Sequence, residues 1–154
     1  MSSCASRRDW MRGMLALSGA ALLAPLPAAA MSDYQWKKRP IVVFSPSETD
    51  ARFVRQKAIL NGARTGFLDR EVVVIYVVGG AMRHDFGPGP GMSGSALRSR
   101  FRASEGAFRV LLIGKDGGIK LDSPAPIAAA DVFAEIDRMP MRRDEIRKRS
   151  TERP

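Results

Sequence analysis

The sequence predicts an α/β domain in which helices flank a mixed four-stranded sheet. A run of seven β-forming residues without alternation, at 72–78, is typical of a strand that is buried on both faces. The Asp-Gly-Gly turn at 116–118 lies between two further apolar runs, as in an antiparallel hairpin. Apolar residues at the i, i+3, i+4 and i+7 positions of 129–136 indicate an amphipathic helix.

Length and composition limit the chemistry that is available. The chain has 154 residues, a length that suits one domain, because two separate cores would each bury too little surface. With one Cys and one His, it cannot form an intrachain disulfide, a CxxC redox pair or a zinc site of the usual Cys and His ligands. We therefore expect no metal and no cofactor.

Residues 1–30 have the features of a secretory signal peptide. Three arginines precede a short apolar run at 14–26, and the alanines at 28–30 offer a cleavage site, most plainly after Ala30. A retained membrane anchor is the alternative, which the shortness of the apolar run disfavours. We expect a periplasmic or secreted mature protein.

The export route stays open between two alternatives. The segment 6–12, Ser-Arg-Arg-Asp-Trp-Met-Arg, is similar to the twin-arginine export motif, although Trp and Met replace the commoner Phe and Leu. An ordinary Sec signal with two arginines is the other alternative. Cys4 precedes the apolar run, so lipidation is not expected, and cleavage removes the sole cysteine.

A polar lead-in at 31–39 precedes the predicted domain at 40–141. The apolar run at 41–44 predicts a first buried strand. Ser47 to Asp50 have the spacing of a capping box, with Ser47 as the N-cap, and should open a helix that ends between Gly62 and Gly66. We expect contacts on both sides of this helix, with Ala51, Val54, Ala58 and Gly62 on one side and Phe53 and Leu60 on the other.

The second half of the domain begins after the strand at 72–78. The glycine- and proline-rich stretch at 79–94 predicts a mobile loop, and 95–102 a short helix with Leu97 and Phe101 turned inward. Two strands at 108–113 and 119–122 then form the hairpin.

The last predicted helix stops at Pro140. The basic tail at 142–154 either extends as a solvated helix or frays.

The predicted order β-α-β-α-β-β-α is the layout of the thioredoxin-like fold. The first two strands must be parallel, because a helical crossover joins them. However, the loop after the first strand, 44–48, contains no cysteine, and 106–108 lacks the proline that this fold places before its third strand. Both halves of the redox site are missing, so we expect no thiol redox activity.

Four segments resemble the domain-of-unknown-function family DUF4174, which is grouped with thioredoxin-like folds. They are Trp-Lys-Lys-Arg-Pro at 36–40, Leu-Asp-Arg at 68–70, LLIGKDGGIK at 111–120 and Ile-Asp-Arg-Met-Pro-Met-Arg-Arg at 136–143. Related domains occur in secreted animal proteins with sushi repeats, so the resemblance implies an extracytoplasmic role such as adhesion or matrix binding. It implies no established activity.

The strongest candidate for a ligand site is basic. Lys115 and Lys120 flank the hairpin turn, and Arg142 and Arg143 follow the last predicted helix. If the end of that helix lies beside the turn, the four side chains form an exposed anion-binding surface for carboxylate, phosphate or sulfate. The alternative is a well-formed turn with solvated lysines.

Other candidates are weaker. Met139 and Met141 could ligate Cu(I), but without a third soft ligand they are better explained by packing at the helix end. His84 could act as a general base, and Ser45 stands where thioredoxins hold a cysteine. We predict no catalytic residues; a periplasmic enzyme with non-thiol chemistry, built on His84 or Ser45, is the rival hypothesis.

The charge balance suggests the class of partner. Without residues 1–30 the chain keeps 22 basic and 15 acidic side chains. For an exported protein this favours anionic polysaccharide, a lipid surface or another envelope protein. No stacking platform of aromatic and basic residues is evident, so nucleic acid is not expected. The sequence thus predicts an exported, non-redox binding or interaction module.

Overall fold

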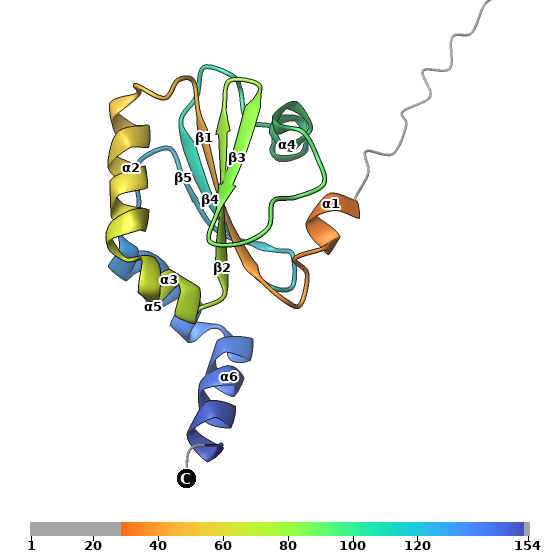
Figure 1. Cartoon of the computed structure of the whole chain (residues 1–154), viewed down its shortest axis with the longest axis vertical. Coiled ribbons are helices and arrows are strands. Elements are labelled where there is room, and N and C mark those ends of the chain that lie inside the picture. The colour runs from red at the N-terminus through yellow and green to blue at the C-terminus, as the bar shows by residue number, and fades with distance from the viewer. Residues whose placement is uncertain (1–28, 153–154) are drawn as a thin grey trace, which may run out of the picture.

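A computed structural model describes residues 29–152 (Figure 1). The predicted signal peptide falls, apart from its last two positions, outside the described residues, and export stays a prediction. The predicted cleavage position after Ala30 falls within the four-residue helix α1 (Ala29–Ser32). Within residues 29–152, none of the helices has the length and apolar character needed to span a bilayer.

A five-stranded mixed sheet forms the centre of the domain. The strand order is β3-β2-β1-β4-β5, in which β1 and β2 are parallel and every other neighbouring pair is antiparallel. The strands are β1 (Arg39–Ser45), β2 (Val72–Val78), β3 (Ala81–Asp85), β4 (Arg109–Ile113) and β5 (Ile119–Ser123).

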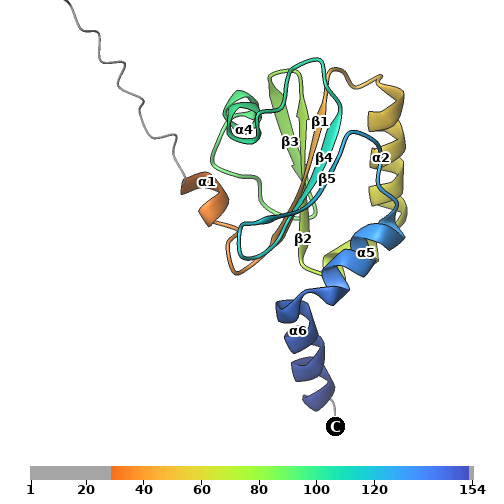
Figure 2. The same cartoon turned by 180° about the vertical axis from the view of Figure 1, so that it is seen from behind.

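Helices cover both faces of this sheet, as Figures 1 and 2 show from opposite sides. One face packs against α2 (Ala51–Gly62), α3 (Arg64–Asp69) and α5 (Ala129–Arg138), and the other against α1 and α4 (Gly94–Phe101). The last helix, α6 (Pro140–Thr151), projects from the end of the sheet at which β1 and β2 begin.

The two central strands explain this layered arrangement. All of β1 is buried, and so is β2 except for its last residue. Val74 and Tyr76 belong to the apolar cluster beneath α2, α3 and α5, whereas Val73 and Ile75 belong to the cluster beneath α4. Continuous β-branched residues allow both faces to be buried, which confirms the expectation for 72–78.

The sheet has five strands rather than the four that the sequence predicts. The stretch at 79–94 is not only a loop, because the chain reverses at Gly79, where φ is +54°, and then returns as β3 along the edge of the sheet. The side chains of β3 are exposed or half-buried. Because β3 has no apolar face, its sequence shows no alternation of apolar and polar residues that would predict a strand. It is a strand because it pairs with β2.

The helix predicted after the first strand, α2, differs from its prediction in two ways. Its buried side consists of Phe53, Gln56 and Leu60, while Val54 on the other predicted side is 54% exposed. The N-cap is Asp50 rather than Ser47, and the Asp50 carboxylate accepts the backbone N–H of Arg52 at 2.9 Å.

The end of α2 at Gly62 agrees with the prediction, but a further helix that the sequence did not predict follows directly. This helix, α3, begins after Ala63 and carries Gly66 against the ring of Phe133, where a Cβ would lie only 2.6 Å from Cζ. Glycine at 66 therefore permits close packing between α3 and α5, and does not end the helix.

The helix around Leu97, α4, and the end of α5 before Pro140 agree with the predictions from the sequence. Leu97 is fully buried and Phe101 half-buried. Pro140 ends α5 and also begins α6, since proline is well suited to the first turn of a helix. Residues 142–151 are thus helical.

Candidate functional site

Three segments meet at the end of the sheet where β1 and β2 begin. They are the lead-in at 31–38, the β4–β5 turn at 114–118 and the α5–α6 junction at 139–141. The backbone N–H of Trp36 donates to the carbonyl of Lys115 at 2.7 Å and ties the lead-in to the turn. In Figure 1 these are the adjacent orange and cyan loops above α6.

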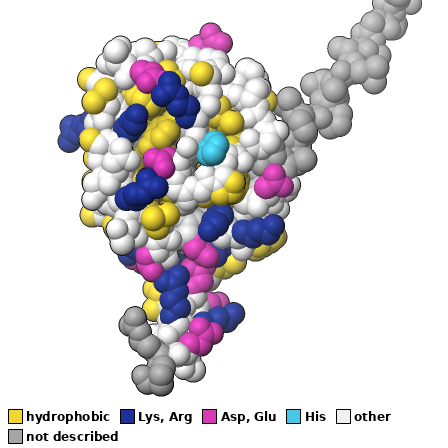
Figure 3. Space-filling view, viewed as in Figure 1, with side chains coloured by type: hydrophobic (Ala, Val, Ile, Leu, Met, Phe, Trp, Pro, Cys, Tyr) yellow, Lys and Arg dark blue, Asp and Glu magenta, His cyan; other side chains and the backbone are white. Residues whose placement is uncertain are grey.

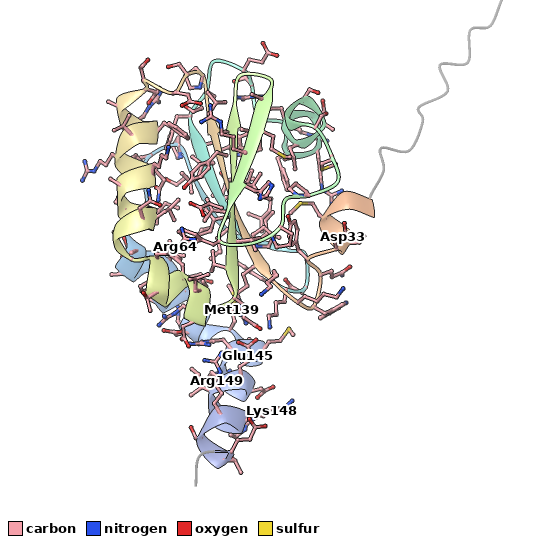
Figure 4. All side chains as sticks on the ribbon, viewed as in Figure 1. Asp33, Arg64, Met139, Glu145, Lys148 and Arg149 are labelled. Atoms are coloured by element: carbon pink, nitrogen blue, oxygen red, sulfur yellow. The ribbon has the colours of Figure 1, made fainter. Side chains whose placement is uncertain are left out.

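A pocket of about 260 Å³ opens between these segments, and we call it the Trp36 pocket. Its apolar lining comes from Trp36 and from the junction, and its polar lining includes Lys115 and Lys120. The full lining is Trp36, Arg39, Gly114, Lys115, Asp116, Lys120, Met139, Pro140 and Met141. The hairpin turn and the helix end therefore share one concave site, and Figure 4 labels Met139 at this junction.

Trp36 is both exposed and held in an unusual backbone conformation. Its side chain is 61% exposed, and its φ of +66° lies in the left-handed region, which costs a residue other than glycine about 1–2 kcal/mol. The backbone is held on either side, because the N–H of Lys37 also donates to the carbonyl of Tyr34 at 2.9 Å. Local strain of this kind persists where the surrounding contacts enforce it.

Arg39 lies at the base of this region and is completely buried. Its guanidinium binds the Glu145 carboxylate through two N–H groups, at 3.0 and 3.3 Å, and donates to the carbonyl of Arg70 at 3.0 Å. Such a paired geometry is the strongest that Arg and a carboxylate adopt. Figure 4 shows Glu145 in the part of α6 nearest the sheet, so this contact fastens α6 to β1.

Two of the predicted anion-binding residues belong to the same set of ion pairs. Lys115 is 8% exposed, and its ammonium donates to Glu71 and, at 2.6 Å, to Glu145. Arg142 is 4% exposed and donates to the carboxylate of Asp69 and, at 3.0 Å, to its carbonyl. The expectation that these two cations are exposed was wrong. Both are buried and paired with the carboxylates of Glu71 and Asp69, which lie far away in the sequence, so no local pattern indicated their burial.

The other two predicted residues lie nearer to solvent. Lys120 lines the Trp36 pocket and binds Asp116 at 2.6 Å. Arg143 is exposed and makes no side-chain ion pair within residues 29–152. The structure therefore places Lys115 and Lys120 in one pocket, whereas Arg142 and Arg143 are not part of its lining. Anion binding by the four stays a prediction.

The carboxylates of this region are stabilised in their charged form. Burial raises the pKa of Glu145, but the hydrogen bonds from Arg39 and Lys115 outweigh burial and leave that pKa below its ordinary value. The pKa values of Asp69 and Asp137 are lowered in the same way, against burial, by the arginines that donate to them. All three are ionised at neutral pH, so the attachment of α6 depends on their charge.

The structure does not bring the candidate enzyme residues together. His84 lies on β3 opposite Ile75, with Nδ1 3.0 Å from the carbonyl oxygen of Gly87. Ser45 is buried opposite Val78, three residues further along β2, and its hydroxyl donates to the carbonyl of Ser47 at 2.8 Å. Within residues 29–152, no group of three His, Cys, Asp or Glu side chains could hold a metal ion.

Comparison with known proteins places the chain in a family. Residues 30–145 match the model of the family described as Domain of unknown function (DUF4174). The chain belongs to this family. All residues that line the Trp36 pocket of this DUF4174 domain lie within the match, and so does Glu145.

A similar curated protein is much longer. Over 136 residues the DUF4174 chain is 27% identical to coiled-coil domain-containing protein 80 of Danio rerio, which covers 75% of this chain and 15% of that protein. The chain thus spans less than a sixth of the length of this relative. No solved structure matches the chain.

The sequence analysis gave no role to Trp36, Arg39 or Glu145. Trp36 and Arg39 both lie in the segment 36–40 that resembles the family, and Trp36 is also an isolated tryptophan between polar residues, but neither observation indicated a pocket. Arg39 and Glu145 look like ordinary charged residues in the sequence, because no local pattern indicates that β1 and α6 meet.

Proposed function

We propose that this chain is an exported binding module that holds its partner at the Trp36 pocket and has no thiol redox activity. The observation that carries the proposal is the pocket itself. It combines an exposed, left-handed Trp36 with apolar walls from Met139 and Met141, and it lies within the part of the chain that matches the family. Large exposed apolar side chains beside a concave surface are typical of binding sites.

The strand order supports the finer assignment to the thioredoxin-like fold. Without β3, the order is β2-β1-β4-β5, with β1 and β2 parallel and the hairpin strands antiparallel. We take this set with its flanking helices as the thioredoxin-like part and β3 as an added edge strand.

The end of β1 supports the absence of redox chemistry. In thioredoxin-like proteins the cysteines lie where this strand ends, whereas here Ser45 is the last residue of β1 and Ser47 lies in the following loop. The Ser45 hydroxyl is buried and bound to the carbonyl of Ser47. A thiolate is the nucleophile in thioredoxin reactions, so the mature chain should not reduce insulin disulfides.

The signal-like segment at 1–30 and the exposed cations direct the choice of partner. Lys120 lines the pocket, although it shares its charge with Asp116, and Lys37 directly follows Trp36. Arg143, two residues after Met141, adds an exposed cation on α6. Anionic polysaccharide, a lipid surface or another envelope protein are the partner classes that we propose to test.

Export and binding can be tested together. Native expression should place the protein outside the cytoplasm, about thirty residues shorter than the full chain. Isolated cell envelope should retain the protein in co-sedimentation, and Trp36→Gly should reduce the retained fraction at least tenfold. Glycine accepts the left-handed backbone, and Trp36 is mostly exposed, so the variant should fold.

Val54→Ala is the matched control, since Val54 is also a mostly exposed apolar side chain but lies on α2. Equal retention of the wild type, Trp36→Gly and Val54→Ala would contradict a role for the pocket. Full-length protein confined to the cytoplasm would contradict export.

A second test concerns the predicted anion-binding cations that face solvent. Replacing Lys120 and Arg143 together by Ala should cost less than about 1 kcal/mol per residue in stability. It should weaken retention on envelope several-fold at low salt and little at high salt, because salt screens exposed charges. The control replaces Arg55 and Lys57, exposed cations on α2, by Ala. If the two double variants weaken retention equally, Lys120 and Arg143 make no specific contact with an anionic partner.

A further inference from the structure

The Trp36 pocket has the size of a site for one large side chain. Its volume of about 260 Å³ lies below the range of roughly 300–1,000 Å³ that is usual for small-molecule sites. Its walls are an indole and the two thioethers of Met139 and Met141, side chains that adapt to apolar groups of different shapes. An apolar side chain of a partner protein fits this lining better than a polar sugar does.

One of the residues that line the pocket has a buried hydrogen-bond donor without an acceptor. Arg39 lines the pocket and is fully buried, yet its Nε has no hydrogen-bond partner within residues 29–152. The other nitrogens of the same guanidinium bind Glu145 and the carbonyl of Arg70. Buried donors are nearly always paired. Because this nitrogen has almost no exposed surface, an occupant of the pocket does not reach it, and the apolar lining and the surrounding charges must hold the occupant.

The surroundings of the pocket carry positive charge that is not neutralised. Lys37 and Lys38 directly follow Trp36, and neither makes an ion pair within the described part of the chain. Lys120 adds a third ammonium, shared with Asp116. Figure 3 shows Lys and Arg side chains, with acidic ones between them, around the place where α6 leaves the domain. Complementary charge steers a partner and selects acidic sequences.

We propose that the occupant of the Trp36 pocket is a peptide segment of another protein, with one large apolar residue in the pocket and Asp or Glu residues beside it. The inference rests on the proposed function and specifies its ligand. The apolar residue packs between Trp36 and the methionines, and its acidic neighbours face Lys37 and Lys38.

The ion pairs argue for a peptide over a polyanion. A sulfated polysaccharide or an anionic membrane needs a row of free cations. Here Lys115 and Arg142 are buried and already neutralised by carboxylates, which removes the two most central charges from such a row. A recessed site with few free charges suits one anchoring side chain.

Trp36 itself can report on binding. The chain has two tryptophans, and Trp10→Phe in the full chain leaves Trp36 as the only indole. A phage library of random dodecapeptides is selected on this protein, and the enriched sequences are synthesised for fluorescence titration. We expect enrichment of a large apolar residue flanked by Asp or Glu, and a blue shift of Trp36 emission on binding.

Variants of both partners then locate the contact. Replacing the apolar residue of the peptide by Ser, or Trp36 by Gly, should weaken binding at least tenfold, the latter measured by competition with a labelled peptide. Lys37→Gln with Lys38→Gln should weaken it about three- to tenfold at low salt. Val54→Ala and Lys57→Gln, both on α2, should have no effect. Circular dichroism verifies that each variant is folded.

The results separate this inference from the proposed function. Vesicles containing phosphatidylglycerol and soluble heparin are titrated in parallel. If either of these shifts Trp36 emission and no peptide does, the peptide inference is overturned while the binding function stands. If no probe shifts the emission or binds in a Trp36-dependent way, both are overturned. Peptide binding that survives Trp36→Gly also overturns the inference.

Discussion

The two ends of the sheet both bury arginine, and they do so in opposite ways. Where β1 and β2 end, Arg98 is 5% exposed and donates only to backbone carbonyls, among them those of Ser45 at 2.7 Å and Gly79 at 2.8 Å. Where the same strands begin, Arg39 and Arg142 donate to carboxylates. Where the strands end, Arg98 holds loops in place through neutral carbonyl acceptors. Where they begin, ion pairs between buried arginines and carboxylates hold α6 against the sheet.

The pKa values of the two kinds of arginine shift in opposite directions. Burial lowers the pKa of Arg98, and the weak attraction of Glu105 does not compensate. Burial also acts on Arg142, but its hydrogen bonds to Asp69 and Asp137 outweigh burial and raise its pKa. The comparison teaches that the buried arginines at the end with α6 and the Trp36 pocket, unlike Arg98, should respond to acid or to the loss of one carboxylate.

The largest effect is expected from Glu145→Gln. Glutamine keeps the shape of the side chain but cannot neutralise Arg39 and Lys115, which are both buried. Breaking a buried ion pair by removing one partner costs about 3–5 kcal/mol, and we expect about 3 kcal/mol because Glu71 still faces Lys115. Urea denaturation followed by circular dichroism measures the loss.

Asp144→Asn is the control for this variant. Asp144 is the preceding residue of α6 and pairs with Arg147 in solvent, so its loss should cost less than about 1 kcal/mol. Similar losses for the two variants would show that the buried ion pairs add nothing beyond surface charge.

A smaller effect is expected from Arg98→Met at the opposite end. Methionine keeps an apolar side chain of similar length but removes the cation–π contact with Phe44 and leaves carbonyls of the strand ends without a donor, at a cost of about 2 kcal/mol. Arg100→Met, an exposed change on the same helix, should be close to neutral. Denaturation of both variants tests this, and a neutral Arg98→Met would contradict the role of Arg98 in joining the loops.

Acid should weaken the buried ion pairs that hold α6 and leave the contacts of Arg98 unchanged. The folded pKa values of Glu145, Asp69 and Asp137 are lowered, so their stabilisation is present above the unfolded values of about 4 and is lost as pH falls through the folded values. Urea midpoints between pH 7 and pH 3 should show the cost of Glu145→Gln shrinking and that of Arg98→Met unchanged. A constant cost of Glu145→Gln down to pH 3 would exclude this explanation.

The sequence was sufficient to predict the elements whose burial follows from the pattern of neighbouring residues. The strand at 72–78, the hairpin around 116–118 and the helix carrying Val132 and Ile136 occur where they were predicted. Each has a local cause, namely β-branched continuity, the Asp-Gly-Gly turn and a helical spacing of apolar residues.

The sequence was insufficient where a contact with a residue distant in the chain decides the structure. β3 is polar and becomes a strand because β2 offers it an unpaired edge. On α2, small apolar residues indicated a second buried side, but the sheet contacts Phe53 and Leu60, and no element covers Val54 within residues 29–152.

Local pattern alone determined the central strands, the hairpin, the family resemblance and the missing cysteines. Only the tertiary structure decided that Lys115 and Arg142 are buried and that Trp36 forms a pocket with the α5–α6 junction. The pairs that decide this are far apart in sequence, since Glu145 lies 106 residues from Arg39 and 30 from Lys115. A cation in a sequence looks the same whether solvated or paired, because the free energy of burying it depends on which carboxylates the fold brings to it.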